Sequence, residues 1–168
     1  MPGVVSDSST LIHLALLGRL DLLREYYDEV LIPPAVWKEV VEQGHGRAGA
    51  REVEEAARSG WLKVESPINE LLLLLLKRDL DDGEAEAIAL SVQREAEMVL
   101  LDESHARRKA AVYGLQKTGV VGLLIRAKVE GKLPSLRQEL DRLRQEAGFW
   151  ISESLYRQAL KAVGEDFG

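Results

Sequence analysis

The chain has 168 residues, of which 46% are hydrophobic and 30% charged, which is typical of one globular domain with a substantial core. Its formal net charge of −6 argues against broad, nonspecific binding to nucleic acid. It contains no cysteine, which excludes disulfides, thiolate catalysis and zinc sites built on cysteine.

Two features of the sequence bear on where the protein acts. No signal-peptide pattern opens the chain, and the apolar run 71–76 is too short to span a bilayer. We therefore expect a cytoplasmic protein without membrane contact. The excess of arginine over lysine and the single asparagine, Asn69, favour a thermophilic source.

Short apolar or β-branched runs alternate with helical patterns along the chain. The runs predict strands at 4–5, 30–32, 61–64 and 98–101. Apolar periodicity, capping residues and a proline at a first helical turn predict helices at 11–15, 20–27, 34–41, 51–58, 70–77, 84–92, 106–113, 120–129, 136–146 and 152–163. This alternation predicts an α/β fold of three layers, α/β/α, with a mainly parallel central sheet. We assign residues 1–133 to this domain and 134–168 to a C-terminal helical extension packed on it.

Four acidic residues stand out by their positions in these elements. Asp7 and Asp102 each follow a predicted strand, where the chain leaves the sheet. Glu39 lies in the helix after the second strand, and Glu84 lies in the first turn of an alanine-rich helix. Sites in open α/β sheets form at the carboxyl ends of the strands, so we expect the four to converge there. The alternative for each is a plain cap or a solvated helix residue.

The alanine-rich helix offers two glutamates, and helical spacing distinguishes them. Glu84 shares a stripe with Ile88 and Val92, the predicted sheet-facing side. Glu86 lies on the stripe of Leu90, which is less inward. We therefore predict that Glu84 belongs to the site.

Carboxylates gathered in one cleft repel each other unless a cation neutralises them. Oxygen ligands favour hard ions, here Mg²⁺ or Mn²⁺, which keep several waters and bind phosphate oxygens. Such ions orient a water, lower its pKa and stabilise charge on a phosphodiester. The four acids, Asp7, Glu39, Glu84 and Asp102, are therefore predicted both as metal ligands and as the catalytic residues.

Other chemistries lack their required patterns in this sequence. His13, His45 and His105 show no metal-ligand spacing, and we expect the first to be packed, the second in a loop and the third on a helix surface. No nucleophile elbow and no glycine-rich phosphate loop occur. Asp7 with Thr10 lacks the second aspartate, two residues on, that an aspartyl-phosphate phosphatase usually carries.

Six segments, which together span nearly the whole chain, follow one another in an order known from a protein family. They are VVSDSSTLIHLA, LIPPAVWKEV, LDDGEAEAIALS, VLLDESHARRKA, GLQKTGVVGLLIRAKVEGKLPSL and GFWISESLYRQAL. With these segments the chain resembles a PIN domain, the metal-dependent nuclease fold of VapC-like toxins, and in particular a branch of uncharacterised predicted PIN nucleases with a C-terminal helical tail.

By position, Asp7, Glu39, Glu84 and Asp102 match the four acids of the family. The sequence departs from the family's pattern at Ser9, where many members have asparagine, and after Asp102, where toxins often carry a further aspartate. The resemblance implies cleavage of single-stranded RNA, with Mg²⁺ or Mn²⁺, by the toxin of a toxin–antitoxin pair whose small antitoxin protein inserts into the cleft. It also implies a homodimer, which the leucine-rich helices favour as well. The alternative is an inactive PIN-like module that binds RNA or a protein.

Overall fold

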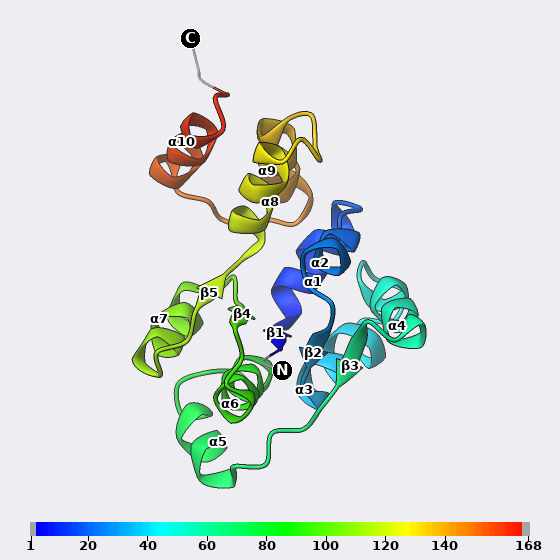
Figure 1. The fold of residues 1–168 in the computed structure, drawn as a ribbon, viewed down its shortest axis with the longest axis vertical. Coiled ribbons are helices and arrows are strands. Elements are labelled where there is room, and N and C mark those ends of the chain that lie inside the picture. The colour runs from blue at the N-terminus through cyan, green and yellow to red at the C-terminus, as the bar shows by residue number, and fades with distance from the viewer. Residues whose placement is uncertain (1–2, 166–168) are drawn as a thin grey trace. The chain divides into compact units, whose positions relative to one another are not determined.

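The computed structural model describes residues 3–165 (Figure 1). The packing divides the chain between Gly119 and Val120 into two compact units, which we describe separately. In this part of the chain no helix is long and apolar enough to cross a membrane.

The first unit is built on a five-stranded, all-parallel sheet. Its strands are β1 (Val4–Ser6), β2 (Val30–Ile32), β3 (Leu62–Val64), β4 (Met98–Leu100) and β5 (Lys117–Thr118), in the spatial order β3-β2-β1-β4-β5. The chain runs outward from β1 to β3 and then returns to place β4 on the other side of β1. The carboxyl ends of β1 and β4 therefore flank the point where the strand order reverses, the usual ligand crevice of such sheets.

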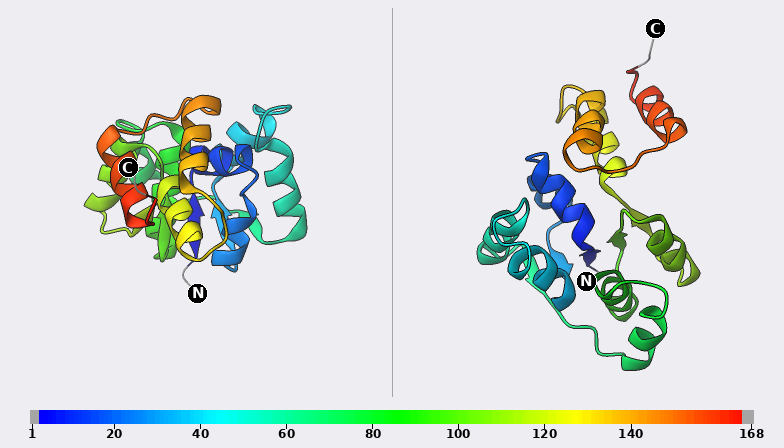
Figure 2. Two further views of the ribbon diagram at one scale, coloured as in Figure 1. Left: turned by 90° about the horizontal axis from the view of Figure 1, so that it is seen from above. Right: turned by 180° about the vertical axis from the view of Figure 1, so that it is seen from behind.

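Helices lie on both faces of this sheet, with α1 and α6 on opposite sides of β1 (Figures 1 and 2). The predicted α/β fold, with a parallel sheet between helical layers, is confirmed. The helices of this unit are α1 (Ser8–Leu16), α2 (Asp21–Tyr26), α3 (Pro34–Trp37), α4 (Ala50–Ser59), α5 (Glu70–Leu76), α6 (Asp82–Arg94) and α7 (Ser104–Val112).

The pleat of the short strands sends alternate residues into the two halves of the core. Val5, Leu31 and Val99 pack into one cluster with residues of α5, α6 and α7. Val4 and Val30 are equally buried and point to the other face. Because both faces are covered at β2 and β4, these strands are continuous apolar runs, which is why a few residues were enough to predict them.

One predicted helix is two different helices in the structure. Pro34 starts α3 at its first turn, and the chain then widens into a π-helix, η1 (Lys38–Glu42), closed by the Gln43 N–H on the Lys38 carbonyl at 2.8 Å. The wider turn changes the phase of the residues that follow Trp37. Such π-turns occur frequently at functional sites, and this one carries Glu39.

Strand β5 is not among the four strands that the sequence predicts. Lys117 and Thr118 are polar and number only two, so neither periodicity nor composition marks them. They join the sheet because β4 offers a free edge, where the Leu101 N–H donates to the Thr118 carbonyl at 2.8 Å.

The second unit packs three helices, α8 (Val120–Val129), α9 (Leu136–Glu146) and α10 (Glu153–Ala162), around leucines such as Leu124, Leu140 and Leu160. Here α8 belongs with the C-terminal helices, whereas we had placed the boundary after residue 133. The division at Gly119 follows the packing of α8 on α9 and α10. The predicted docking of the extension on the α/β domain stays a prediction.

Candidate active site at the carboxyl edge of the sheet

Asp7 and Asp102 lie side by side where β1 and β4 end. Asp7 Oδ2 accepts a hydrogen bond from the Asp102 backbone N–H at 3.2 Å, and the Asp7 N–H donates to the Leu100 carbonyl at 3.0 Å. Asp7 Oδ1 accepts from the Thr10 N–H at 2.9 Å, so the same carboxylate also caps α1. We name Asp7 and Asp102 the strand-end pair.

The strand-end pair is buried, and this changes the acidity of Asp7. Only 2% of Asp7 and 3% of the Asp102 side chain are exposed. Burial first, and the neighbouring charge of Asp102 second, raise the pKa of Asp7 to about 8, against the lowering effect of the hydrogen bonds from Thr10 and from the Asp102 N–H. Without a cation nearby, burial and the neighbouring carboxylate therefore favour the protonated form of Asp7.

His13 and Gly119 hold Asp102 from two sides. His13 Nδ1 lies 2.7 Å from Asp102 Oδ2. A Cβ on Gly119 would stand 2.5 Å from Asp102 Oδ1 and 2.8 Å from the Leu101 carbonyl oxygen, so only glycine fits there. We had expected His13 to be a packed residue without a role in the site. No spacing in the sequence links positions 13, 102 and 119, because only the order of the strands brings α1 beside the end of β4.

Glu39 approaches the same edge from η1 through a serine. Ser8, which follows Asp7 and begins α1, donates from Oγ to Glu39 Oε2 at 3.1 Å. A Cβ on Gly83, in the first turn of α6, would lie 3.4 Å from Glu39 Oε2 and 3.5 Å from Ser8 Oγ. The starts of α1 and α6 therefore meet at the Glu39 carboxylate, which is otherwise exposed.

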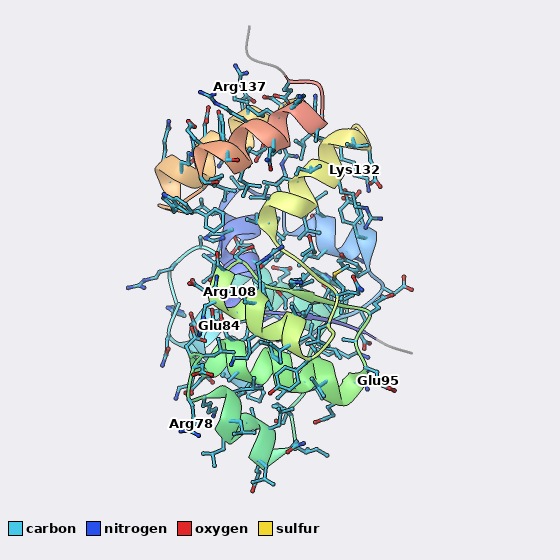
Figure 3. The ribbon with its side chains drawn as sticks, turned by 90° about the vertical axis from the view of Figure 1, so that its left-hand side faces the viewer. Arg78, Glu84, Glu95, Arg108, Lys132 and Arg137 are labelled. Atoms are coloured by element: carbon cyan, nitrogen blue, oxygen red, sulfur yellow. The ribbon has the colours of Figure 1, made fainter. Side chains whose placement is uncertain are left out.

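Glu84 lies half-buried in the first turn of α6, where Asp81 caps the helix and accepts from the Glu84 N–H at 2.8 Å (Figure 3). Burial first, and then the charge of Asp81, raise the pKa of Glu84 to about 7, with smaller contributions from Glu103 and Glu39. Glu84 therefore belongs to the electrostatic environment of Glu39. We name Glu39 and Glu84 the helix pair.

Glu86 has a different and structural set of contacts. Its Oε1 accepts from the Ala35 backbone N–H at 3.1 Å, which caps the start of α3, and its Oε2 lies 3.7 Å from Lys77 Nζ. These contacts account for Glu86 without a ligand. The preference for Glu84 over Glu86 as a site residue stays a prediction. In it, Glu84 is a metal ligand and Glu86 stabilises the start of α3.

The four predicted acids thus fall into two pairs along one edge. Among residues 3–165, no three histidine, aspartate or glutamate side chains converge closely enough to hold a metal ion. The chemistry of the donors nevertheless fits a hard divalent ion. They offer carboxylate oxygens, and the raised pKa values of Asp7 and Glu84 show that both lie where a negative charge is poorly stabilised.

Of the basic run after Asp102, two residues are engaged within the fold. Arg107 donates from a guanidinium nitrogen to the Leu101 carbonyl at 3.2 Å, beside the strand-end pair, and Lys109 Nζ lies 2.7 Å from Asp79. Arg108 is exposed (Figure 3). Arg107 is therefore the cation of this run that lies at the site.

The family comparison agrees with this geometry. A family model described as DUF3368, PIN domain, matches residues 3–165. The chain belongs to this PIN-domain family. The PIN fold is a nuclease-type fold, PIN domains are generally nucleases, and they typically use divalent metal ions. The resemblance inferred from the sequence is confirmed at the level of the family.

A solved structure supports the fold of this PIN domain. The chain is similar to the structure of a PilT N-terminus domain protein from the hyperthermophilic archaeon Sulfolobus solfataricus P2. The two sequences are 17% identical and the TM-score is 0.50, and the similarity covers 76% of this chain and 93% of that one. No curated protein matches the sequence.

Proposed function

We propose that this PIN domain is a Mg²⁺- or Mn²⁺-dependent endoribonuclease and the toxin component of a toxin–antitoxin pair. The observation that carries the proposal is the strand-end pair, two buried carboxylates held side by side at the reversal point of the sheet. Burying two like charges destabilises the fold unless a cation is bound. The fold keeps this arrangement with a raised pKa at Asp7, as a site built for a cation would.

In this proposal Asp7, Glu39, Glu84 and Asp102 hold the divalent ion. When bound, the ion supplies a more acidic water and stabilises charge on the phosphodiester. His13 fixes the orientation of Asp102, and Ser8 fixes that of Glu39, through the hydrogen bonds already described. Arg107 lies at the same edge and offers a guanidinium to a phosphate oxygen.

Single-stranded RNA and a small antitoxin protein are the partners that we propose. The chain carries a net charge of −6, so RNA must be recognised at a local site rather than by the overall field. Arg107 supplies positive charge beside the strand-end pair. An antitoxin that inserts a basic side chain between these carboxylates would compete with the metal ion. Cytoplasmic location and a thermophilic source stay predictions.

A second candidate is an inactive PIN-like module that binds RNA or a protein. One observation favours it, because no three acidic or histidine side chains of residues 3–165 converge on one point. Both oxygens of Asp7 already accept backbone hydrogen bonds, so the fold satisfies this carboxylate without a metal ion.

Cleavage of labelled single-stranded RNA by purified protein separates the two candidates. We expect cleavage with Mn²⁺ or Mg²⁺ and none with EDTA. The cleavage rate is expected to fall by more than about 100-fold in Asp7→Asn and Asp102→Asn, because losing a direct metal ligand costs more than the 10–100-fold typical of residues that only orient the ligands. Glu54→Gln, on the exposed face of α4, is the matched control and keeps full activity. If wild type and Asp7→Asn cleave equally, the nuclease assignment is wrong and the binding module stands.

A growth assay tests the toxin role. Induced expression of the wild-type chain in a bacterial host is expected to arrest growth, and expression of Asp102→Asn at equal protein level is not. Equal growth with both chains, in spite of metal-dependent cleavage in the test tube, would contradict the toxin role and leave the nuclease intact.

A further inference from the structure

The π-helix η1 carries Glu39, and its wide turn agrees with the valines that it buries. In an α-helix continued from α3, Val41 would be turned by about 140° from Val36, at about 100° per residue. In a π-turn, the fifth residue after a given one comes back over it. Val36, Val40 and Val41 are all buried in the structure. The wide turn therefore places all three valines on the core side and fixes the direction in which Glu39 leaves the helix.

Gly44 comes very close to the backbone at the end of η1. A Cβ at this position would overlap the Val40 carbonyl oxygen, and it would stand only 3.1 Å from the Glu39 carbonyl oxygen. The φ angle of Gly44 lies outside the left-handed region, so the need for glycine comes from this contact and not from a backbone torsion. Any side chain at position 44 would force this end of η1 to open.

The loop that follows Gly44 returns to η1 and to α1. The Arg47 N–H donates to the Gly44 carbonyl at 2.8 Å, which turns the chain back. Gly49 then lies against both helices, because a Cβ on it would stand 3.4 Å from Val40 Cγ1 and 3.5 Å from Ile12 Cγ1. Ile12 belongs to α1, whose first turn follows the strand-end pair. The turn at Gly44 therefore sets η1 against the helix that borders the site.

We infer that Gly44 is a positioning residue for Glu39. Because position 44 carries no side chain, η1 closes at Gln43 with its wide turn intact, and in this form the Glu39 carboxylate accepts the hydrogen bond from Ser8 at the start of α1. A side chain at position 44 displaces the Val40 carbonyl, opens the turn and moves Glu39 away from Ser8. The inference rests on the proposed function where it concerns metal binding, and it is independent of that function where it concerns the contact with Ser8.

The width of η1 can be measured on the wild-type chain by NMR, through the scalar coupling that crosses a hydrogen bond. We expect a coupling between the Gln43 amide nitrogen and the Lys38 carbonyl carbon, five residues back. A coupling to the Glu39 carbonyl carbon, four residues back, is that of an α-helix. That result would overturn the inference without the need for any variant.

Urea unfolding of Gly44→Ala, Ser8→Ala and the double variant, without metal, tests the positioning itself. We expect Ser8→Ala to lower the urea midpoint of wild type and to leave that of Gly44→Ala unchanged, because the bond between serine and Glu39 is then already lost. Equal drops in both backgrounds would overturn the inference. If Gly44→Ala does not fold, Gln43→Pro replaces it in the same cycle, since it removes the N–H that closes η1 at an exposed position whose φ of −79° suits proline.

Titration with Mn²⁺ extends the test to the proposed metal site. Gly44→Ala is expected to weaken Mn²⁺ binding about tenfold in wild type and less than about twofold in Glu39→Gln, where the ligand is already removed. Gly60→Ala is the control, because its φ of +90° costs stability while an added Cβ would meet no atom within 4 Å, and it is expected to keep Mn²⁺ affinity. Equal weakening in Gly44→Ala and Gly60→Ala would overturn the positioning role. If wild type binds no Mn²⁺, the nuclease proposal fails, whereas the Ser8 cycle still decides how Glu39 is positioned.

Discussion

The strand-end pair and the helix pair reach the same edge of the sheet by different routes. Asp7 and Asp102 are buried and held by backbone N–H groups, by His13 and by the close approach of Gly119. Glu39 is exposed, and Ser8 donates one hydrogen bond to its carboxylate. Glu84 is half-buried, and its backbone N–H, rather than its carboxylate, is bound by Asp81.

This difference indicates that the strand-end pair is held more rigidly than the helix pair. The hydrogen-bond ladder between parallel strands fixes the Cα positions of the strand-end pair, and burial fixes their side chains. Glutamates at helix starts have three rotatable bonds and solvent around them. We therefore expect the strand-end pair to be preformed before a metal ion binds, and the helix pair to adjust when it does.

The largest effect is expected from filling the space beside the strand-end pair. Gly119→Ala puts a methyl group 2.5 Å from Asp102 Oδ1, so the carboxylate must move. We expect RNA cleavage to fall more than about 100-fold and the free energy of unfolding to fall by about 1–3 kcal/mol. Activity assays and urea unfolding measure the two effects.

Gly83→Ala is the matched control, since its methyl group would make an ordinary contact at 3.4 Å with Glu39 Oε2. We expect cleavage to change by no more than about threefold. Equal losses in both variants would contradict the difference in rigidity between the two pairs.

The next effect concerns His13, which holds the strand-end pair. His13→Ala removes the contact to Asp102 Oδ2, and we expect cleavage to fall about 10–100-fold, with a weaker Mn²⁺ affinity. His13→Asn keeps an N–H donor near the Nδ1 position and is expected to recover most of the activity. His105→Ala, an exposed histidine on α7, is the control. If His13→Asn does not recover the cleavage activity, the imidazole ring is needed for more than the orientation of Asp102.

Titration of Mn²⁺ into two glutamine variants tests the helix pair. Glu84→Gln is expected to weaken Mn²⁺ binding about tenfold, because it removes one carboxylate from the site. Glu86→Gln keeps Mn²⁺ affinity and lowers stability by no more than about 0.5 kcal/mol, because the amide oxygen still accepts from the Ala35 N–H and only the charge near Lys77 is lost. The reverse result would move the site to Glu86.

The smallest effect is the pH dependence of stability without metal. The pKa of Asp7 rises from 3.8 to about 8 and that of Glu84 from 4.5 to about 7, so the folded chain holds protons that the unfolded chain has released. Stability therefore falls as pH rises from about 4 to about 8, and the loss is complete above that window.

Melting temperatures measured in EDTA between pH 5 and pH 9 test this. The melting temperature of wild type is expected to drop over this range by a few degrees more than that of the double variant Asp7→Asn, Glu84→Gln. Saturating Mn²⁺ is expected to remove the difference in slope, since the ion favours both charged forms. Identical slopes in EDTA would show that neither carboxyl carries a raised pKa.

The sequence by itself determined most elements of this fold, with β5 and the π-helix η1 as exceptions, and the candidates for its site. Apolar runs such as Val30–Ile32 and caps such as Asn69 and Asp81 are local signals, readable within a few residues. Asp7 and Asp102 could be named because each follows a strand. The choice of Glu84 over Glu86 stays a prediction, since Leu90, on the stripe of Glu86, is as fully buried as Ile88. The family followed from the order of these segments.

Only the tertiary structure decided how the candidates meet. The return of the chain to place β4 beside β1 brings Asp102, His13 and Gly119 together across about 90–110 residues of sequence, and no local pattern encodes that pairing. The π-turn at Glu39, the two-residue strand β5 and the grouping of α8 with the second unit also depend on neighbours distant in sequence. Periodicity reports which face of an element is buried, whereas the partner of that face is set by long-range packing.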